Sequence, residues 1–295
     1  MAGNSPGLCY NTGDSMPHLS IDGLRLNYQS VGQGPAVLLM HGWASSWRMW
    51  ARSMSRLARA GYQAWAVDLI GFGESDKPDD GWYTLGRFTY TLAEFCDRMA
   101  IVRPAVVGHS LGGTIALNLA LQRDIRALMV VAPVVNGELS LSLHLLLTSP
   151  MARRLFRWMR RQAFFSTLGD MNILAAPQLF RDPVRRRDQQ DLGVTTVNAA
   201  MGSLRTLVTS NLESRLANIR VPSLVLVGER DIVVAPAQGR LAARLIPGAR
   251  WVTWPDVGHK LIDERGDDFD ALMLDHIGNA AAHIIAEMPA VLSGL

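Results

Sequence analysis

Short apolar runs alternate with amphipathic segments along most of the chain. Each run is bounded by turn residues and is too short for a typical buried helix, so we expect buried strands there. These strands fall at residues 36–40, 63–69, 105–107, 127–135, 223–227 and 250–253. Helical periodicity predicts helices at residues 46–60, 85–102, 111–122, 236–245 and about 264–286. Buried strands that alternate with helices predict a parallel, doubly wound sheet with right-handed crossovers.

The amino-terminal region follows a different pattern. Residues 1–17 show no strand or helix periodicity, and we expect a flexible tail. From residue 18, alternating residues on both sides of Asp22 and Gly23 predict an antiparallel hairpin. The hairpin would extend one edge of the sheet, which would then have about eight strands.

The segment at residues 137–205 interrupts this alternation. It carries helical patterns without an intervening strand and is punctuated by prolines. We interpret it as a helical cap inserted over the sheet. The cap would divide the core into a first part, residues 18–136, and a second part, residues 206–295.

The cap also differs from the rest of the chain in charge. The whole chain carries a net charge of +3, whereas the cap has ten arginines against five acidic residues. A helix predicted at residues 151–165 places Leu155, Trp158, Met159 and Gln162 or Ala163 on one stripe, with Arg153, Arg157, Arg160 and Arg161 mostly opposite. Such a helix could make weak contact with a membrane surface or with an acidic group of a substrate. A cap helix packed on the sheet, with solvated arginines, is the favoured interpretation.

Composition limits the remaining possibilities. Hydrophobic residues make up 48% and charged residues 19% of the 295 residues, which is typical of a globular domain. No apolar stretch reaches the roughly 18 residues of a membrane span, and the start lacks a secretory signal pattern. With only Cys9 and Cys96, a disulfide framework is improbable and a cytoplasmic location is expected. We expect no nucleic-acid partner, and the oligomeric state is open.

The strongest candidate for chemistry is the serine in "AVVGHSLGGT", residues 105–114. Gly108, Ser110 and Gly112 fit the pattern G-x-S-x-G, directly after a predicted strand and before a predicted helix. A sharp turn there strains the serine backbone, and glycines avoid collisions across it. The helix start favours negative charge. Ser110 is therefore the candidate nucleophile, and the backbone N–H of Leu111 is the first candidate donor to an oxyanion.

This motif resembles the nucleophile elbow of the α/β-hydrolase family, and further loops resemble that family too. After the predicted strand at residues 36–40 the chain continues His41-Gly42-Trp43, similar to the family's His-Gly oxyanion loop. The resemblance implies that the Trp43 N–H is the second oxyanion donor and that His41 is a structural loop residue. The family's chain order of nucleophile, acid and base implies that Asp231 is the acid and His259 the general base.

Other residues compete for these roles or extend the site. Glu229, Asp256 and Asp263 are rival acids, although Asp256 and Asp263 lie too close to His259 along the chain to orient it easily. The candidate lining of the substrate pocket consists of Trp43, Trp47 and His109. The leucine-rich segment at residues 139–147 could line the pocket or belong to the core.

The segment from Asp68 to Ser75 also resembles the family. Ser75 could be a nucleophile, or the glycines a phosphate cradle, but Asp76 stands where the third glycine of G-x-G-x-x-G belongs. A structural turn is preferred. No histidine, cysteine or carboxylate cluster has metal-ligand spacing, so we expect neither a metal nor a cofactor.

The resemblance implies an α/β-hydrolase fold and a serine hydrolase that forms an acyl-enzyme. Serine at the elbow differs from the aspartate of the family's epoxide hydrolases and haloalkane dehalogenases. His109 resembles lipase and esterase elbows, whereas carbon–carbon bond hydrolases usually carry asparagine there. An apolar cap favours a small-molecule carboxylic ester with a lipophilic acyl or alcohol part. A lactonase, a thioesterase and a membrane-associated lipid hydrolase are alternatives; a carbon–carbon bond hydrolase or a non-enzymatic ligand receptor is less favoured.

Overall fold

The computed structural model describes residues 17–79, 81–138, 151–168 and 182–287. In its helices at Ala152–Leu168 and Gly266–Glu287, side chains are described up to residues 161 and 280. The predicted tail and the leucine-rich segment at 139–147 therefore lie almost wholly outside the described residues.

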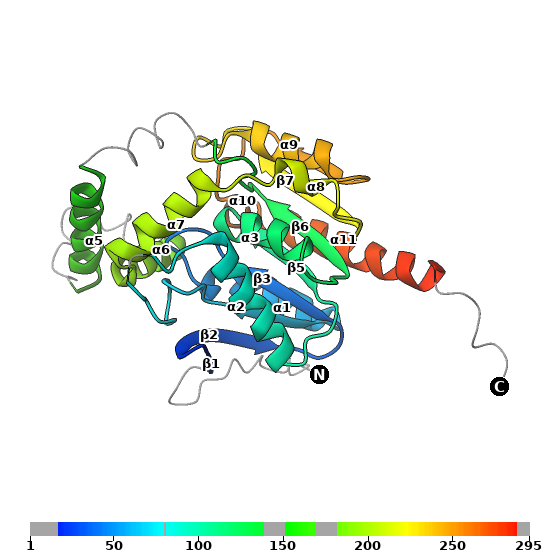
Figure 1. Ribbon diagram of the computed structural model, residues 1–295, viewed down its shortest axis with the longest axis horizontal. Coiled ribbons are helices and arrows are strands. Elements are labelled where there is room, and N and C mark those ends of the chain that lie inside the picture. Colours follow the sequence, from blue (N-terminus) through cyan, green and yellow to red (C-terminus); the bar gives the residue numbers. More distant parts are fainter. Residues whose placement is uncertain (1–16, 80, 139–150, 169–181, 288–295) are drawn as a thin grey trace, which may run out of the picture.

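An eight-stranded sheet forms the centre of the molecule (Figure 1). Its strand order is β1-β2-β4-β3-β5-β6-β7-β8, with β1–β2 and β2–β4 antiparallel and every other pair parallel. The strands are β1 (His18–Ile21), β2 (Leu24–Val31), β3 (Ala36–Met40), β4 (Gln63–Val67), β5 (Ala105–His109), β6 (Ala127–Val131), β7 (Ser223–Gly228) and β8 (Arg250–Trp254). The predicted doubly wound, mostly parallel sheet with a hairpin at one edge is confirmed.

Helices cover both faces of this sheet. The helices in the described part of the chain, which include three cap helices that do not lie on these faces, are η1 (Trp47–Trp50), α1 (Ala51–Arg59), α2 (Leu85–Arg98), α3 (Leu111–Ala120), α5 (Ala152–Leu168), α6 (Pro183–Val194), α7 (Val197–Thr209), α8 (Glu213–Leu216), α9 (Pro236–Leu245), α10 (Leu261–Glu264) and α11 (Gly266–Glu287). Alternate residues of β3 face opposite sides, so Leu38 packs into one core cluster with α2, α3 and α9. Leu39 packs into the other, with α1 and α11. A parallel sheet buried on both faces explains why its strands are continuous apolar runs.

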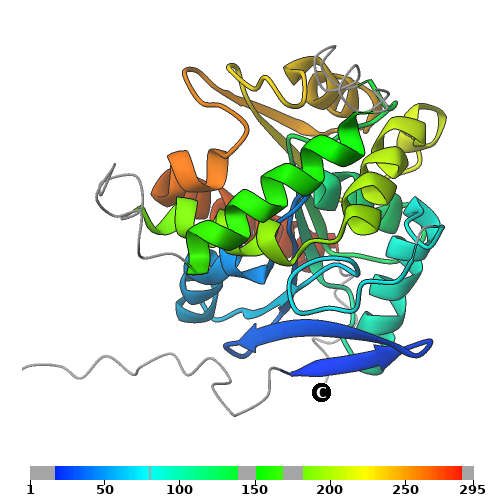
Figure 2. The same ribbon diagram turned by 90° about the vertical axis from the view of Figure 1, so that its left-hand side faces the viewer.

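Three helices of the predicted cap, α5, α6 and α7, lie at one end of the sheet (Figure 1). In the turned view α5 crosses in front of the sheet (Figure 2). Helix α6 begins where the Asp182 carboxylate accepts a hydrogen bond from the Val184 N–H, 2.9 Å, and α7 begins at a similar Thr196 cap. The predicted end of the cap at Arg205 falls inside α7, which continues to Thr209.

Several predicted elements end earlier than expected. The strand predicted to reach residue 69 stops at Val67, and the strand predicted to reach residue 135 stops at Val131. The apolar residues beyond each strand are still buried, but they belong to loops. No helix in the described part of the chain is long and apolar enough to cross a membrane.

Candidate active site

Ser110 lies in a strained turn between β5 and α3. Its φ is 53° and its ψ is −115°, in a region that residues other than glycine rarely adopt. A β-carbon at Gly108 would lie 2.2 Å from the Gly112 carbonyl oxygen, and one at Gly112 would lie 2.4 Å from the Met40 carbonyl oxygen. The backbone therefore passes through this turn only with glycine at both positions. The Ser110 N–H donates to the Val131 carbonyl, 2.8 Å, which ties the strained residue to β6.

Asp231 and His259 come from the loops that follow β7 and β8. His259 Nδ1 lies 2.6 Å from Asp231 Oδ2. The other carboxylate oxygen accepts the N–H groups of Val233 and Val234, at 2.8 and 2.9 Å, and the Asp231 side chain is completely buried. Since a carboxylate only accepts, Nδ1 carries the proton and Nε2 is the basic nitrogen of neutral His259.

The rival acids have other partners: none of them forms the bond to the His259 ring that Asp231 forms. Asp256 pairs with Arg230 at the exposed surface, and Asp263 accepts two hydrogen bonds from the Arg187 guanidinium. Glu229 contacts the Thr253 hydroxyl at 3.5 Å. Of these four carboxylates, Asp231 is the one that hydrogen-bonds to the His259 ring.

The loop after β3, residues 41–46, contacts the turn that carries Ser110; because it contains Trp43, a candidate oxyanion donor, we call it the oxyanion loop. A β-carbon at Gly42 would lie 2.8 Å from His109 Nδ1 and 3.3 Å from Ser110 Cβ. His41 is fully buried, Nδ1 donates to the Gly42 carbonyl at 2.7 Å, and Nε2 accepts the Leu69 N–H at 2.9 Å. Burial lowers the pKa of His41, so the ring is neutral and holds the loop.

His109 contacts the loop that carries His259, the candidate base. Its Nε2 lies 2.9 Å from the His259 carbonyl oxygen, and the two rings have centroids 4.8 Å apart. Burial, and then the nearby His259 ring, lower the pKa of His109 to about 3. A neutral ring whose Nε2–H donates to a carbonyl fixes the His259 backbone without adding charge beside the base.

A cavity of about 440 Å³ joins these groups. The residues around it that bear on the chemistry are Gly42, Trp43, His109, Ser110 and His259. Trp47, a predicted lining residue, does not line this cavity. Its side chain packs against the core cluster that contains α1, and its backbone N–H donates to Asp68 Oδ1 at 2.7 Å. Adjacency in sequence to Trp43 is misleading here, because η1 begins at Trp47 and turns it toward the sheet.

The cap supplies the apolar wall of the cavity. Phe156 of α5 is buried and packs edge-on against Trp43, with ring centroids 5.7 Å apart. The predicted apolar stripe of this helix is only partly right: Leu155 and Met159 line the cavity, but Trp158 is 59% exposed, and the buried ring is that of Phe156, which is 1% exposed. The side chain of Gln162 or Ala163 lies outside the described residues. Membrane contact through this basic helix stays a prediction, which salt-sensitive binding to anionic liposomes would test.

One part of the cavity wall is polar. Arg187 of α6 donates to both oxygens of Asp263, at 3.0 and 2.8 Å, and to Asp188 at 2.8 Å. Lys260 pairs with Asp188. Sequence reasoning missed this cluster, because Arg187 and Asp188 lie more than 70 residues from Lys260 and Asp263, and all four look like ordinary surface charges.

The segment from Asp68 to Ser75 is a structural turn, as preferred from the sequence. The Ser75 hydroxyl is buried, donates to the Asp68 carbonyl at 2.6 Å and accepts the Asn27 N–H at 2.8 Å. Among the described residues, no group of three or more histidine, cysteine or carboxylate side chains could hold a metal ion.

Known proteins resemble this chain along most of its length. A family model described as the alpha/beta hydrolase fold matches residues 35–266. The chain is 32% identical over 267 residues to the dihydrolipoyllysine-residue acetyltransferase component of the acetoin cleaving system of Cupriavidus necator, covering 88% of this chain and 68% of that protein. It is 36% identical over 100 residues to bifunctional epoxide hydrolase 2 of Sus scrofa, of which the match covers 18%.

Solved structures show the same likeness. The crystal structure of a hydrolase from Pseudomonas aeruginosa PA01 superposes with a TM-score of 0.72 at 26% identity, over 91% of this chain and all of that one. The eight-stranded sheet and the family match together define the class of protein. The chain belongs to the α/β-hydrolase family.

Proposed function

We propose that the protein is a serine hydrolase that cleaves carboxylic esters with a lipophilic acyl or alcohol part. The observation that carries this proposal is the shared cavity, into which Ser110 and a His259 already bonded to buried Asp231 both open. A serine hydroxyl is a weak nucleophile at neutral pH and needs such a base.

In the proposed reaction His259 Nε2 takes the proton of the Ser110 hydroxyl as its oxygen attacks the ester carbonyl. Asp231 holds the imidazole in the required tautomer and stabilises the imidazolium. The backbone N–H groups of Leu111 and Trp43 donate to the oxyanion of the tetrahedral intermediate. The imidazolium then protonates the leaving alcohol, and water attacks the acyl-enzyme by the same route.

The identity of residue 110 helps to decide which relatives share the proposed chemistry. Several related proteins are named epoxide hydrolases. Attack on an epoxide through a covalent ester needs a carboxylate nucleophile, whereas Ser110 offers a hydroxyl. The apolar wall formed by Phe156 and its neighbours favours a lipophilic ester group.

A turnover screen tests the proposal. Esters of increasing chain length, lactones, thioesters, lipids and epoxides are offered to wild type and to the Ser110→Ala variant. We expect ester hydrolysis by wild type and a loss on the order of 10⁶-fold in Ser110→Ala, as for other members of such triads. Equal ester turnover by a folded Ser110→Ala variant would refute the proposal, and turnover of epoxides alone would refute the ester assignment.

A further inference from the structure

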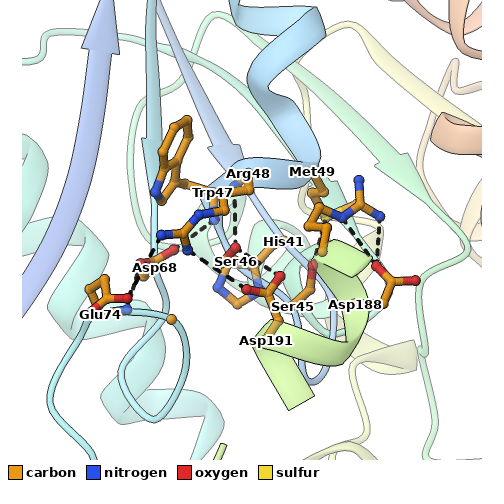
Figure 3. A network of polar contacts seen from close by, with 12 residues as sticks. His41, Ser45, Ser46, Trp47, Arg48, Met49, Asp68, Glu74, Asp188 and Asp191 are labelled. Carbon is orange, nitrogen blue, oxygen red and sulfur yellow. Dashed lines mark hydrogen bonds and ion pairs between the residues drawn. The ribbon is translucent and has the colours of Figure 1, made fainter. Parts of the chain in front are cut away.

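All three cap helices that the structure describes contact the oxyanion loop, at Trp43 or at Ser46. Helix α5 contacts Trp43 through Phe156, and α7 accepts the Trp43 indole N–H at the Ala200 carbonyl, 3.0 Å. Helix α6 reaches the end of the loop, where the Ser46 hydroxyl donates to Asp191 Oδ2 at 2.9 Å. Figure 3 shows the Asp191 side chain pointing from its helix toward Ser46.

Ser46 is well placed to transmit this contact. Its side chain accepts the Arg48 N–H at 3.4 Å and so begins the helical turn η1, while the next residue, Trp47, donates its N–H to Asp68 Oδ1 at 2.7 Å. The loop between His41 and Ser46 also contains Ala44 at a φ of 50°, a strained conformation for alanine. A strained loop keeps its conformation only when contacts at both of its ends hold it in place.

The Asp191 carboxylate is an unfavourable group to bury. It is 1% exposed, and its nearest cation is Arg48, whose Nη1 lies 3.8 Å away and whose side chain is 35% exposed. Besides Arg48, the charged groups around it are Asp68, which opposes its ionisation, and Arg187, which favours it. Burial dominates and raises the pKa of Asp191 to about 6. Asparagine would fill the same space without this charge.

We propose that Asp191 is a positioning residue: through Ser46 it holds the oxyanion loop, so that the cap helix α6 helps to set the place of the Trp43 N–H. This inference rests on the proposed function. An ionised carboxylate accepts a stronger hydrogen bond from the Ser46 hydroxyl than the amide oxygen of asparagine would, which gives the buried charge a role at this position. The cap then contributes to transition-state stabilisation as well as covering the cavity.

The test is the Asp191→Asn variant, which keeps size and an acceptor but removes charge. We expect kcat on ester substrates to fall about tenfold with KM unchanged, since a slightly displaced oxyanion donor weakens only the transition state. The affinity for a trifluoromethyl ketone, which forms an oxyanion at the serine, should fall by the same factor. The melting temperature should stay equal or rise, because a buried charge is gone.

Controls separate this role from a loss of structure. Asp182→Asn changes an exposed carboxylate on the same helix and should leave kcat unaltered, because asparagine also caps helices. Ser46→Ala should reproduce the loss, and the double variant should add little to it. Unchanged kcat in Asp191→Asn, a lower melting temperature that accounts for the loss, or losses that multiply in the double variant would overturn the inference.

Amide hydrogen exchange keeps the two proposals distinguishable. Peptides that span residues 41–47 should exchange faster in Asp191→Asn than in wild type or in Asp182→Asn, whatever the enzyme hydrolyses. Equal exchange would overturn the positioning role even if Ser110-dependent ester hydrolysis is found. Faster exchange in a protein without ester turnover would instead refute only the proposed function.

Discussion

The turn that carries Ser110 and the cap that covers it hold the candidate site by different means. At the turn, backbone atoms leave no room for a side chain at Gly108 or Gly112, so local sequence and the neighbouring strands fix the conformation. In the cap, position depends on side-chain pairs such as Phe156 with Trp43 and Asp191 with Ser46. The partners of these pairs lie more than 100 residues apart in the sequence, so no local pattern fixes the cap as the glycines fix the turn.

The largest expected effect concerns Asp231, the candidate acid in the loop that follows β7. Asp231→Asn keeps the size of the side chain but offers an N–H₂ group to His259 Nδ1, which favours the wrong tautomer. We expect kcat on esters to fall on the order of 10⁴-fold with the fold retained. Steady-state kinetics and circular dichroism measure this. Asp256→Asn, a rival acid paired at the surface with Arg230, serves as control, and a comparable loss in that variant would reverse the assignment.

The next prediction tests whether backbone crowding fixes the turn that carries Ser110. Gly108→Ala places a β-carbon against the Gly112 carbonyl, so the turn must shift, and we expect the free energy of unfolding to drop by about 4 kcal/mol. Gly86→Ala is the matched control, because a β-carbon there meets nothing within 4 Å and alanine favours its helix α2. Urea unfolding of both variants measures the difference. Equal stability of the two would show that the turn tolerates side chains.

The next prediction concerns the pH dependence of the free energy of unfolding, and it tests the cap through the buried carboxylate of Asp191. Because burial raises the pKa of Asp191 from 3.8 to about 6, the native state disfavours its charged form. Below about pH 4 the group is protonated in both native and unfolded chains and has no effect; between pH 4 and 6 the unfolded chain ionises first. Relative to Asp191→Asn, wild type should therefore lose on the order of 3 kcal/mol of stability as the pH rises through this range. Urea unfolding at several pH values measures the loss, and parallel curves for the two proteins would contradict it.

The smallest effect concerns selectivity. Phe156→Ala removes a ring from the cavity wall and from its contact with Trp43, so kcat/KM should fall about tenfold for long acyl chains and less for acetyl esters. Trp158→Ala, an exposed aromatic residue on the same helix, should change neither value. A series of p-nitrophenyl esters measures the chain-length profile. An equal loss for all chain lengths would show that Phe156 does not select the acyl group.

The same contrast explains what the sequence could predict. The turn at Ser110 and the loops with Trp43, Asp231 and His259 follow short motifs after buried strands, and parallel strands bring their carboxyl ends to one edge. The local sequence pattern is therefore enough to predict most of this turn and these loops.

The cap carries no such local information. In α5 apolar residues occur on several sides, so which of them is buried depends on Trp43, a residue far away in the sequence. Asp191 sits in a helix rich in arginine and aspartate and looks like a surface charge until Ser46 is placed against it. Trp47 is predicted to line the pocket, but no local pattern shows that η1 begins there and that the side chain packs against the core.

Reaction with a fluorophosphonate tests the central claim most directly, since the reagent modifies only a serine that a neighbouring base activates. We predict a single adduct on the intact protein, located by peptide mapping to Ser110 and absent in Ser110→Ala. Labelling should slow strongly in His259→Ala. An unlabelled wild type, or an adduct on any other serine, would contradict the assignment of Ser110 as the nucleophile.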